Sequence, residues 1–280
     1  MRDFRYTQTL SEIPKIYFLI KIIGDYRMKS KFSEKFNQLL ERAKTDDNII
    51  GLFLVGSRGK CFDNEHSDYD IKIITNDEVA ETYNKEFAIL KSIDIDLVVM
   101  SLSELKSYAE WNTPFAWDRY TFSHVKTLID KTGEIQKIID QKGLIPEKER
   151  HDFIANSLDG YINQVFRSIK CFRNQNILGA RLEASVSIPC LLDLVFALHG
   201  RPKPFFGYLE KELNLYPLEK LPWKADEFIQ KILLILSSAD LATQQEMLKT
   251  IKIWLRKEGF KKVFDDWEGK DKWTMNYRPQ

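Results

Sequence analysis

The chain has 280 residues, enough for one large domain or two domains of ordinary size. Hydrophobic residues make up 44% and charged residues 30%, a balance typical of a globular protein with a packed core. The formal net charge of +1 argues against bulk nucleic-acid binding or attraction to a membrane surface, but it leaves room for a local basic pocket.

The cysteines and the N-terminal apolar run indicate in which cellular compartment the protein is expected. The cysteines form no CxxC pair and no metal-type spacing, which favours reduced thiols in a cytoplasmic protein. They are Cys61, Cys171 and Cys190. The apolar run Ile16–Ile23 is interrupted by Lys21, is followed by no small-residue cleavage site and is too short to cross a bilayer. We therefore treat residues 1–27 as an N-terminal extension and expect no signal peptide and no membrane span.

The first half of the chain mixes helical and strand patterns. Residues 31 to 44 predict an amphipathic helix whose apolar face carries Phe32, Phe36, Leu39, Leu40 and Ala43. Short apolar runs predict strands over 49–55, 70–75, 93–100 and 125–130, with a helix over 79–90. A further helix follows the third strand, capped by Ser101 or Ser103 with Glu104 in its first turn.

Beyond Ile145-Pro146 only helical spacing remains. Apolar residues recur at three- and four-residue steps over 154–172, 191–198 and 228–236, and Pro189 is expected to kink or divide its helix. The sequence thus predicts an α+β protein. Its domain of residues 28–145 has a mixed sheet flanked by helices, and its domain of residues 146–280 is all-helical.

The stretch LFLVGSRGKCFDNEHSDYDIKIIT, residues 52 to 75, holds two carboxylates at the start of a strand. Residues two apart in a strand point to the same face, so Asp68 and Asp70 share one face, as Asp94 and Asp96 do in the next strand. Like charges so close repel one another. Hard divalent cations such as Mg²⁺ offset that repulsion and bind through oxygen ligands together with substrate phosphates.

The turn at Gly56-Ser57 suits a phosphate ligand. Glycine lets the backbone approach a ligand closely, and free N–H groups would hold a phosphate if Ser57 opens a helix. Arg58 and Lys60 are expected to add positive charge in the same loop.

This pattern resembles the signature of the polymerase-beta-like nucleotidyltransferase superfamily. That signature is an apolar strand, Gly-Ser, a polar loop, Asp-x-Asp in a second strand and a third carboxylate on a later strand. The matching residues are Gly56-Ser57, the loop 58–67, Asp68-Tyr69-Asp70 and Asp96, with Asp94 as the competing third carboxylate. The similarity spans roughly residues 31 to 130. The helical half is similar, more weakly, to that of small antibiotic-modifying members such as aminoglycoside adenylyltransferases.

The resemblance implies binding of a nucleoside triphosphate and Mg²⁺, with two ions expected, and a transferase that releases pyrophosphate. Asp68 and Asp70 would ligate metal, and Asp96 would ligate metal or act as general base. The predicted reaction moves AMP from ATP to a hydroxyl of a small molecule such as an aminoglycoside or lincosamide. Two alternatives stay open: a protein or tRNA acceptor, and a non-catalytic nucleotide-binding module with the same fold.

The helical half offers further candidates. One polar stripe at helical spacing holds Tyr161, Gln164, Arg167, Lys170 and Arg173. We expect Lys170 and Arg173 to bind the triphosphate, the alternative being a solvated helix face. Glu183 would receive the proton of the acceptor or form an ordinary ion pair with Arg181 or Lys170.

Two aromatic segments carry weaker signals. The segment Arg201–Tyr208 is read as a substrate-facing loop or a packed connector, with Pro202 and Pro204 stiffening it. Packing is expected to account for Trp111, Trp117 and Tyr120.

Overall fold

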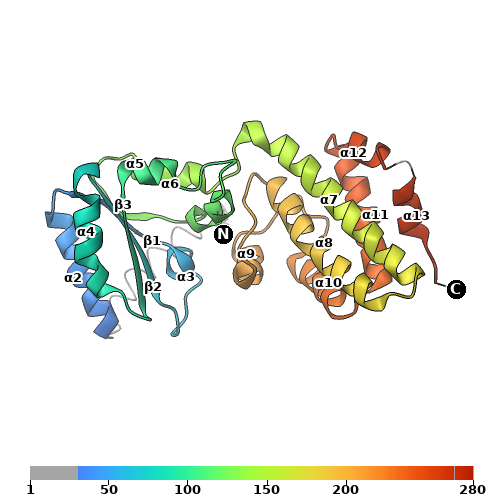
Figure 1. The fold of residues 1–280 in the computed structure, drawn as a ribbon, viewed down its shortest axis with the longest axis horizontal. Coiled ribbons are helices and arrows are strands. Elements are labelled where there is room, and N and C mark those ends of the chain that lie inside the picture. Colours follow the sequence, from blue (N-terminus) through green and yellow to red (C-terminus); the bar gives the residue numbers. More distant parts are fainter. Residues whose placement is uncertain (1–30, 268, 280) are drawn as a thin grey trace, which may run out of the picture. The chain divides into compact units, whose positions relative to one another are not determined.

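The computed structural model describes residues 31–267 and 269–279, so the predicted extension of residues 1–27 lies outside the described residues. The chain divides between Gly143 and Leu144 into two compact units, close to the boundary predicted after residue 145. We call residues 31–143 the sheet unit and residues 144–279 the helical unit (Figure 1).

The sheet unit is built on four strands in the order β3-β2-β1-β4. Their bounds are β1 Ile49–Leu54, β2 Tyr69–Thr75, β3 Ile95–Ser101 and β4 Thr127–Asp130. β1 runs antiparallel to both β2 and β4, whereas β2 and β3 are parallel. The α+β class with a mixed sheet is thereby confirmed. β3 begins two residues later than predicted because Ser92 and Ile95 bond to each other's backbone in a turn.

Helices cover both faces of the sheet (Figure 1). One face packs against α2 (Lys31–Thr45) and α4 (Ala80–Phe87), which the short 3-10 helices η1 (Asp77–Val79) and η2 (Ala88–Leu90) flank. Its core includes Leu52, Ile71, Ile73, Leu97, Phe36, Leu40 and Phe87. The other face packs against α5 (Leu102–Ser107), α6 (Ile135–Lys142) and the 3-10 helix η3 (Ala116–Phe122). Its core includes Phe53, Ile74, Met100, Leu105, Phe122 and Ile139. Burial of each such side chain contributes about 1.5–3 kcal/mol.

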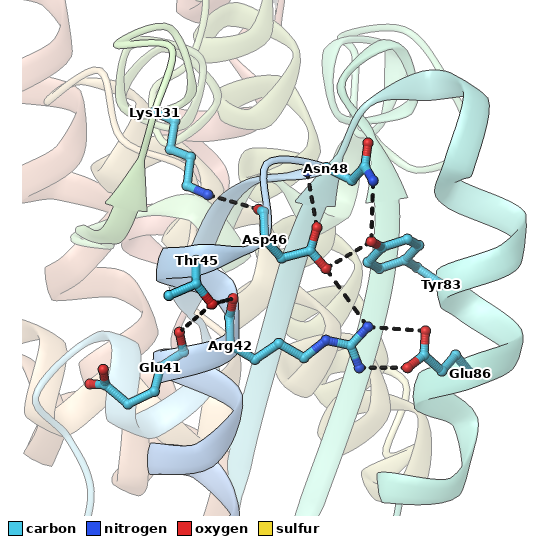
Figure 2. A network of polar contacts seen from close by, with 8 residues as sticks. All are labelled: Glu41, Arg42, Thr45, Asp46, Asn48, Tyr83, Glu86 and Lys131. Carbon is cyan, nitrogen blue, oxygen red and sulfur yellow. Dashed lines mark hydrogen bonds and ion pairs between the residues drawn. The ribbon is translucent and has the colours of Figure 1, made fainter.

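A polar network ties α2 to α4 and to the turn after β4 (Figure 2). Arg42 donates to both carboxylate oxygens of Glu86, at 2.5 and 3.1 Å. The Tyr83 hydroxyl donates to the Asp46 carboxylate at 2.7 Å, and Lys131 Nζ donates to the Asp46 carbonyl at 2.8 Å. Because Arg42 and Glu86 are partly exposed, their ion pair contributes only about 0–1 kcal/mol.

A capping box starts α5. The Ser101 hydroxyl accepts from Glu104 N at 3.0 Å, and the Glu104 carboxylate accepts from Ser101 N at 2.7 Å. Ser101 is therefore the cap, and Ser103 instead contacts the Asp77 carboxylate.

The helical unit contains no strand among the described residues 144–267 and 269–279, which confirms the all-helical prediction. Its helices are α7 (Glu147–Arg173), α8 (Ile177–Ala197), α9 (Leu209–Leu215), α10 (Ala225–Ser238), α11 (Leu241–Lys257), α12 (Lys261–Asp265) and α13 (Lys270–Asn276), with the 3-10 helix η4 (Phe206–Tyr208). α7 and α8 pack side by side, and a Cβ at Gly160 would lie 3.3 Å from Cys190 Sγ. Pro189 does not divide α8, which continues through it to Ala197. None of the described helices has the length and apolar character to cross a membrane.

Candidate functional site

Asp70 of β2 and Asp96 of β3 lie side by side. The register of the parallel pair sets Asp70 opposite Asp96, so their side chains leave the sheet on the same face. Asp68 precedes β2 by one residue and, by the alternation of a strand, faces the same way. Asp70 is half-buried, whereas Asp68 and Asp96 are exposed. The fold thus brings together the three carboxylates that the sequence singled out.

The electrostatics of Asp70 show that these carboxylates interact. Burial raises the pKa of Asp70 above its ordinary value, and the charges of Asp68 and Asp96 raise it further. Asp94 is not among the charges acting on Asp70; its backbone carbonyl accepts from Tyr69 N at 2.9 Å. The register and the pKa of Asp70 both favour Asp96 over Asp94 as the third member.

Gly56 gives the Asp70 carboxylate its place. Gly56 begins the one-turn helix α3 (Gly56–Gly59) with a φ of +58°. A Cβ at Gly56 would lie 1.8 Å from Asp70 Oδ2, so any larger residue would displace the carboxylate. Val55 N donates to the Asp70 carbonyl at 2.9 Å and fixes the turn against β2. In this turn, glycine therefore allows the backbone to lie close to the side chain of Asp70.

Arg58 holds the end of the loop that carries Asp68. Its Nε donates to the Asp68 carbonyl at 2.8 Å and its Nη2 donates to the Ser67 carbonyl at 2.7 Å. The guanidinium lies 4.1 Å from the ring centroid of Tyr69. Its predicted contact with a nucleotide stays a prediction; the contacts in the structure position the backbone of Asp68.

Lys60 does not supply positive charge to the loop surface as expected. Its side chain is 0% exposed, and Nζ donates to the carbonyls of Tyr120, Thr121 and Ser123 at 2.8, 2.9 and 2.7 Å. The last carbonyls of a helix lack intrahelical partners, and Lys60 donates to those at the end of η3, of which the Tyr120 carbonyl also accepts from Ser123 N at 3.0 Å. The long aliphatic stem lets the charged end reach them through the core.

Two charged residues of this face escaped the sequence analysis. Lys72 lies two residues beyond Asp70 on β2 and is half-buried. Asp118 of η3 accepts from the hydroxyls of Tyr108 and Thr121, both at 2.6 Å. Burial and the bond to Asp118 raise the pKa of Tyr108 to about 12, so its hydroxyl keeps the proton that it donates. The strand alternation used for Asp68 and Asp70 also signals Lys72, but no local pattern points to Asp118.

The carboxylates suit an ion that arrives with a substrate. Among residues 31–267 and 269–279, no group of three or more His, Cys, Asp or Glu side chains is placed to hold a metal ion. Mg²⁺ is usually bound by one or two carboxylates plus phosphate oxygens, and all-protein cages are unusual for it. The all-oxygen donors and the raised pKa of Asp70 fit that kind of site.

In the helical unit, Glu183 is engaged in an ion pair. Arg167 Nε and Nη2 donate to Glu183 Oε1 at 2.9 and 2.6 Å. Glu183 therefore forms an ion pair, which was one of its two predicted roles, but its partner is Arg167 and not Arg181 or Lys170. Its role toward an acceptor stays a prediction.

Lys170 and Arg173 lie at the C-terminal end of α7, and both are exposed. The Arg173 guanidinium is 5.5 Å from the ring centroid of Trp273, and its Nε donates to Asn174 Oδ1 at 3.2 Å. Their predicted contact with a triphosphate stays a prediction.

The segment Arg201–Tyr208 has the contacts of a packed connector. Arg201 donates to the Tyr216 carbonyl at 2.8 Å and pairs with the buried carboxylate of Glu212. Lys203 pairs with Asp193 at 2.8 Å.

Packing accounts for Tyr120 but not for Trp117. Tyr120 is fully buried, as expected, whereas Trp117 is 69% exposed. The prediction for Trp117 was wrong because the inward positions of η3 are taken by residues 119 to 122.

No family model and no curated protein matches the chain. A nucleotidyltransferase-like protein from Exiguobacterium sibiricum 255-15 aligns with 88% of this chain and 77% of its own, with 14% identity and a TM-score of 0.38. A likeness of this extent does not establish a shared activity.

Proposed function

We propose that the protein is a nucleotidyltransferase. It would move a nucleoside monophosphate, with ATP as the favoured donor, to a hydroxyl of a small molecule and release pyrophosphate. The observation that carries this proposal is the position of Asp70, which lies beside Asp96 and is influenced by the charge of Asp68. Its carboxylate lies against Gly56, where there is no room for a side chain. A half-buried carboxylate among like charges favours a bound cation.

The chain's residues take the following roles in the proposed reaction. Asp68 and Asp70 would hold Mg²⁺ together with the triphosphate, and Asp96 would be a further ligand or the base that accepts the proton of the attacking hydroxyl. The hydroxyl oxygen forms a bond to the α-phosphorus as the bond from that phosphorus to the bridging oxygen breaks, and pyrophosphate leaves. Bound Mg²⁺ would neutralise the charge that develops on the phosphate oxygens.

Other groups would bind the substrates. The backbone N–H groups at the start of α3, in Gly56 and Ser57, are proposed to contact the β- and γ-phosphates with Arg58. Lys170 and Arg173 are proposed to add positive charge from the helical unit.

An aminoglycoside or lincosamide is the proposed acceptor class, which would make the activity one of antibiotic modification. This choice is supported only by the succession of a sheet unit and a helical unit. Asp94 and Glu183 stay candidate contacts to the acceptor.

The test is Mg²⁺-dependent release of pyrophosphate with a panel of nucleoside triphosphates and hydroxylated acceptors. Asp68→Asn, Asp70→Asn and Asp96→Asn are expected to abolish release while circular dichroism shows a folded protein. Glu65→Gln is the matched control, since it removes an exposed carboxylate from the loop before β2, and it should keep most of the activity. Wild-type release that persists in Asp70→Asn would refute the proposal. Nucleotide binding without turnover on any acceptor would instead indicate a non-catalytic module.

A further inference from the structure

Two large aromatic side chains remain exposed near the start of η3. The exposed fraction is 69% for Trp117 and 54% for Phe115. Exposed aromatic residues are common on protein surfaces, so exposure alone does not mark a binding site. Trp117 differs in two respects: its helix lies against the loop of the proposed site, and hydrogen bonds hold the backbone around it.

η3 packs on the sheet face that carries the Asp70 carboxylate. Ile74 follows Asp70 by four residues on β2, so both side chains leave the sheet on the same face. Ile74 belongs to one core cluster with Phe122 of η3. The proposed site and η3 therefore lie on the same side of the sheet.

Lys60 connects η3 to the turn at Gly56. Its Nζ donates to three carbonyls at the end of η3, including that of Tyr120 at 2.8 Å, and it lies 4.6 Å from the Tyr120 ring centroid. Lys60 directly follows α3, which begins at Gly56 against the Asp70 carboxylate. These contacts fix η3 beside the loop that places Asp70.

The Trp117 indole lies on the side of η3 that carries Tyr120. Side chains three residues apart lie above one another in a 3-10 helix. The hydrogen bond from Thr121 Oγ1 to Asp118 at 2.6 Å joins one such pair on η3. Trp117 and Tyr120 are the preceding pair. The indole is therefore one turn from the ring that contacts Lys60, and it reaches solvent, whereas the Tyr120 ring is buried.

Hydrogen bonds hold the backbone on both sides of Trp117. Arg119 is buried, and its guanidinium donates to two backbone carbonyls at 2.9 and 2.8 Å. The Tyr108 hydroxyl donates to the Asp118 carboxylate at 2.6 Å, and the Tyr108 ring stacks on Phe115 with centroids 5.8 Å apart. A ring on a backbone that is already ordered binds a flat ligand with little further loss of conformational entropy.

A nucleotide is the ligand that this position suits. Its phosphates would lie at the carboxylates with Mg²⁺, and its base needs a surface close by. Nucleobases stack on exposed aromatic side chains, and removing such a side chain weakens binding by about 5- to 150-fold. Stacking depends on the area of the base more than on the groups at its edge, so the larger purines gain more from it than pyrimidines do.

We propose that Trp117 binds the base of the donor nucleotide by stacking and so sets a preference for purine over pyrimidine nucleotides. This inference rests on the proposed function and adds the part of the nucleotide that the carboxylates do not contact. It makes Trp117 a specificity-determining residue of the proposed reaction.

The experiment compares two ligands, of which only one has a base. The full chain is titrated with Mg²⁺ and either a non-hydrolysable ATP analogue or inorganic tripolyphosphate, and circular dichroism checks the folding of each variant. Trp117→Ala should weaken binding of the ATP analogue about tenfold and leave binding of tripolyphosphate unchanged. Trp117→Phe keeps an aromatic face and should lose less. Ile253→Ala is the matched control, since Ile253 is 63% exposed on α11, and it should bind both ligands as the wild type does.

Two further readouts report on the stacked base itself. The ATP analogue should quench the indole fluorescence of the wild type more than that of Trp117→Phe. A non-hydrolysable CTP analogue should bind the wild type more weakly than the ATP analogue does, and this difference should shrink in Trp117→Ala.

The outcomes separate this inference from the proposed function. Unchanged affinity of Trp117→Ala for the ATP analogue would overturn the inference and leave the nucleotidyltransferase proposal standing. An equal loss for the ATP analogue and tripolyphosphate would also overturn it, because the substitution would then act on the phosphates. Equal quenching in the wild type and Trp117→Phe would do the same. A wild type that binds neither the nucleotide analogues nor tripolyphosphate would refute the proposed function together with the inference.

Discussion

Replacing Gly56 with alanine tests whether the position of the Asp70 carboxylate controls the reaction. The new Cβ would lie 1.8 Å from Asp70 Oδ2 and 2.8 Å from its Cγ. Ordinary contacts begin at 3.4 Å, so the oxygen must move by about 1.6 Å, which requires a different rotamer of Asp70. The carboxylate would then no longer face Asp96 as it does in the wild type.

Two effects are expected in Gly56→Ala. The φ of +58° costs an L-residue about 1–2 kcal/mol, which lowers the free energy of unfolding by that amount. Displacing a reacting group by about 1 Å can cost about 100-fold in rate, so pyrophosphate release should fall by at least about that factor. Steady-state assays of pyrophosphate and thermal unfolding measure the two effects separately.

Gly133→Ala is the matched control. Gly133, in the turn after β4, has a φ of +70°, and nothing lies within 4 Å of a Cβ built there. It should therefore lose a similar amount of stability and keep its activity. Equal activities of Gly56→Ala and Gly133→Ala would refute the idea that Gly56 sets the position of Asp70.

Three more predictions concern charge. Because burial and neighbouring carboxylates raise the pKa of Asp70, its ionised form destabilises the folded state, so in metal-free buffer Asp70→Asn should raise the melting temperature at neutral pH. That gain should vanish in acid, where the wild-type carboxyl is protonated, and a lower melting temperature at neutral pH would contradict the reasoning. Lys60→Met removes the charged donor from the carbonyls of Tyr120, Thr121 and Ser123, of which the Tyr120 carbonyl still accepts from Ser123 N, and should cost roughly 2 kcal/mol of unfolding free energy; an unchanged denaturation midpoint would disprove this. The double variant Lys170→Ala/Arg173→Ala should weaken binding of the ATP analogue about tenfold in titration calorimetry at low salt, and less at high salt. Unchanged affinity would leave both side chains as a solvated helix face.

Local patterns were enough to predict the class of the fold. Apolar runs bounded by turn residues predicted the four strands, and three- and four-residue spacing predicted the helical unit. The capping box of α5 could also be read, since it depends on residues three apart. The pairing of Asp68 with Asp70 on one face follows from the two-residue period of a strand. Each of these features depends on residues that are close neighbours in the chain.

The tertiary structure decided what depends on distant segments. The register between β2 and β3 set Asp96 beside Asp70, because the alignment of two strands is not a property of either strand alone. Burial of Lys60 required the carbonyls of a segment 60 residues away. The hydrogen bond from Tyr108 to Asp118 likewise required η3 to pack beside the segment that follows α5. Sequence alone thus determined the chemical types at the site, and long-range packing determined their partners, since packing energies depend on contacts that chain proximity does not specify.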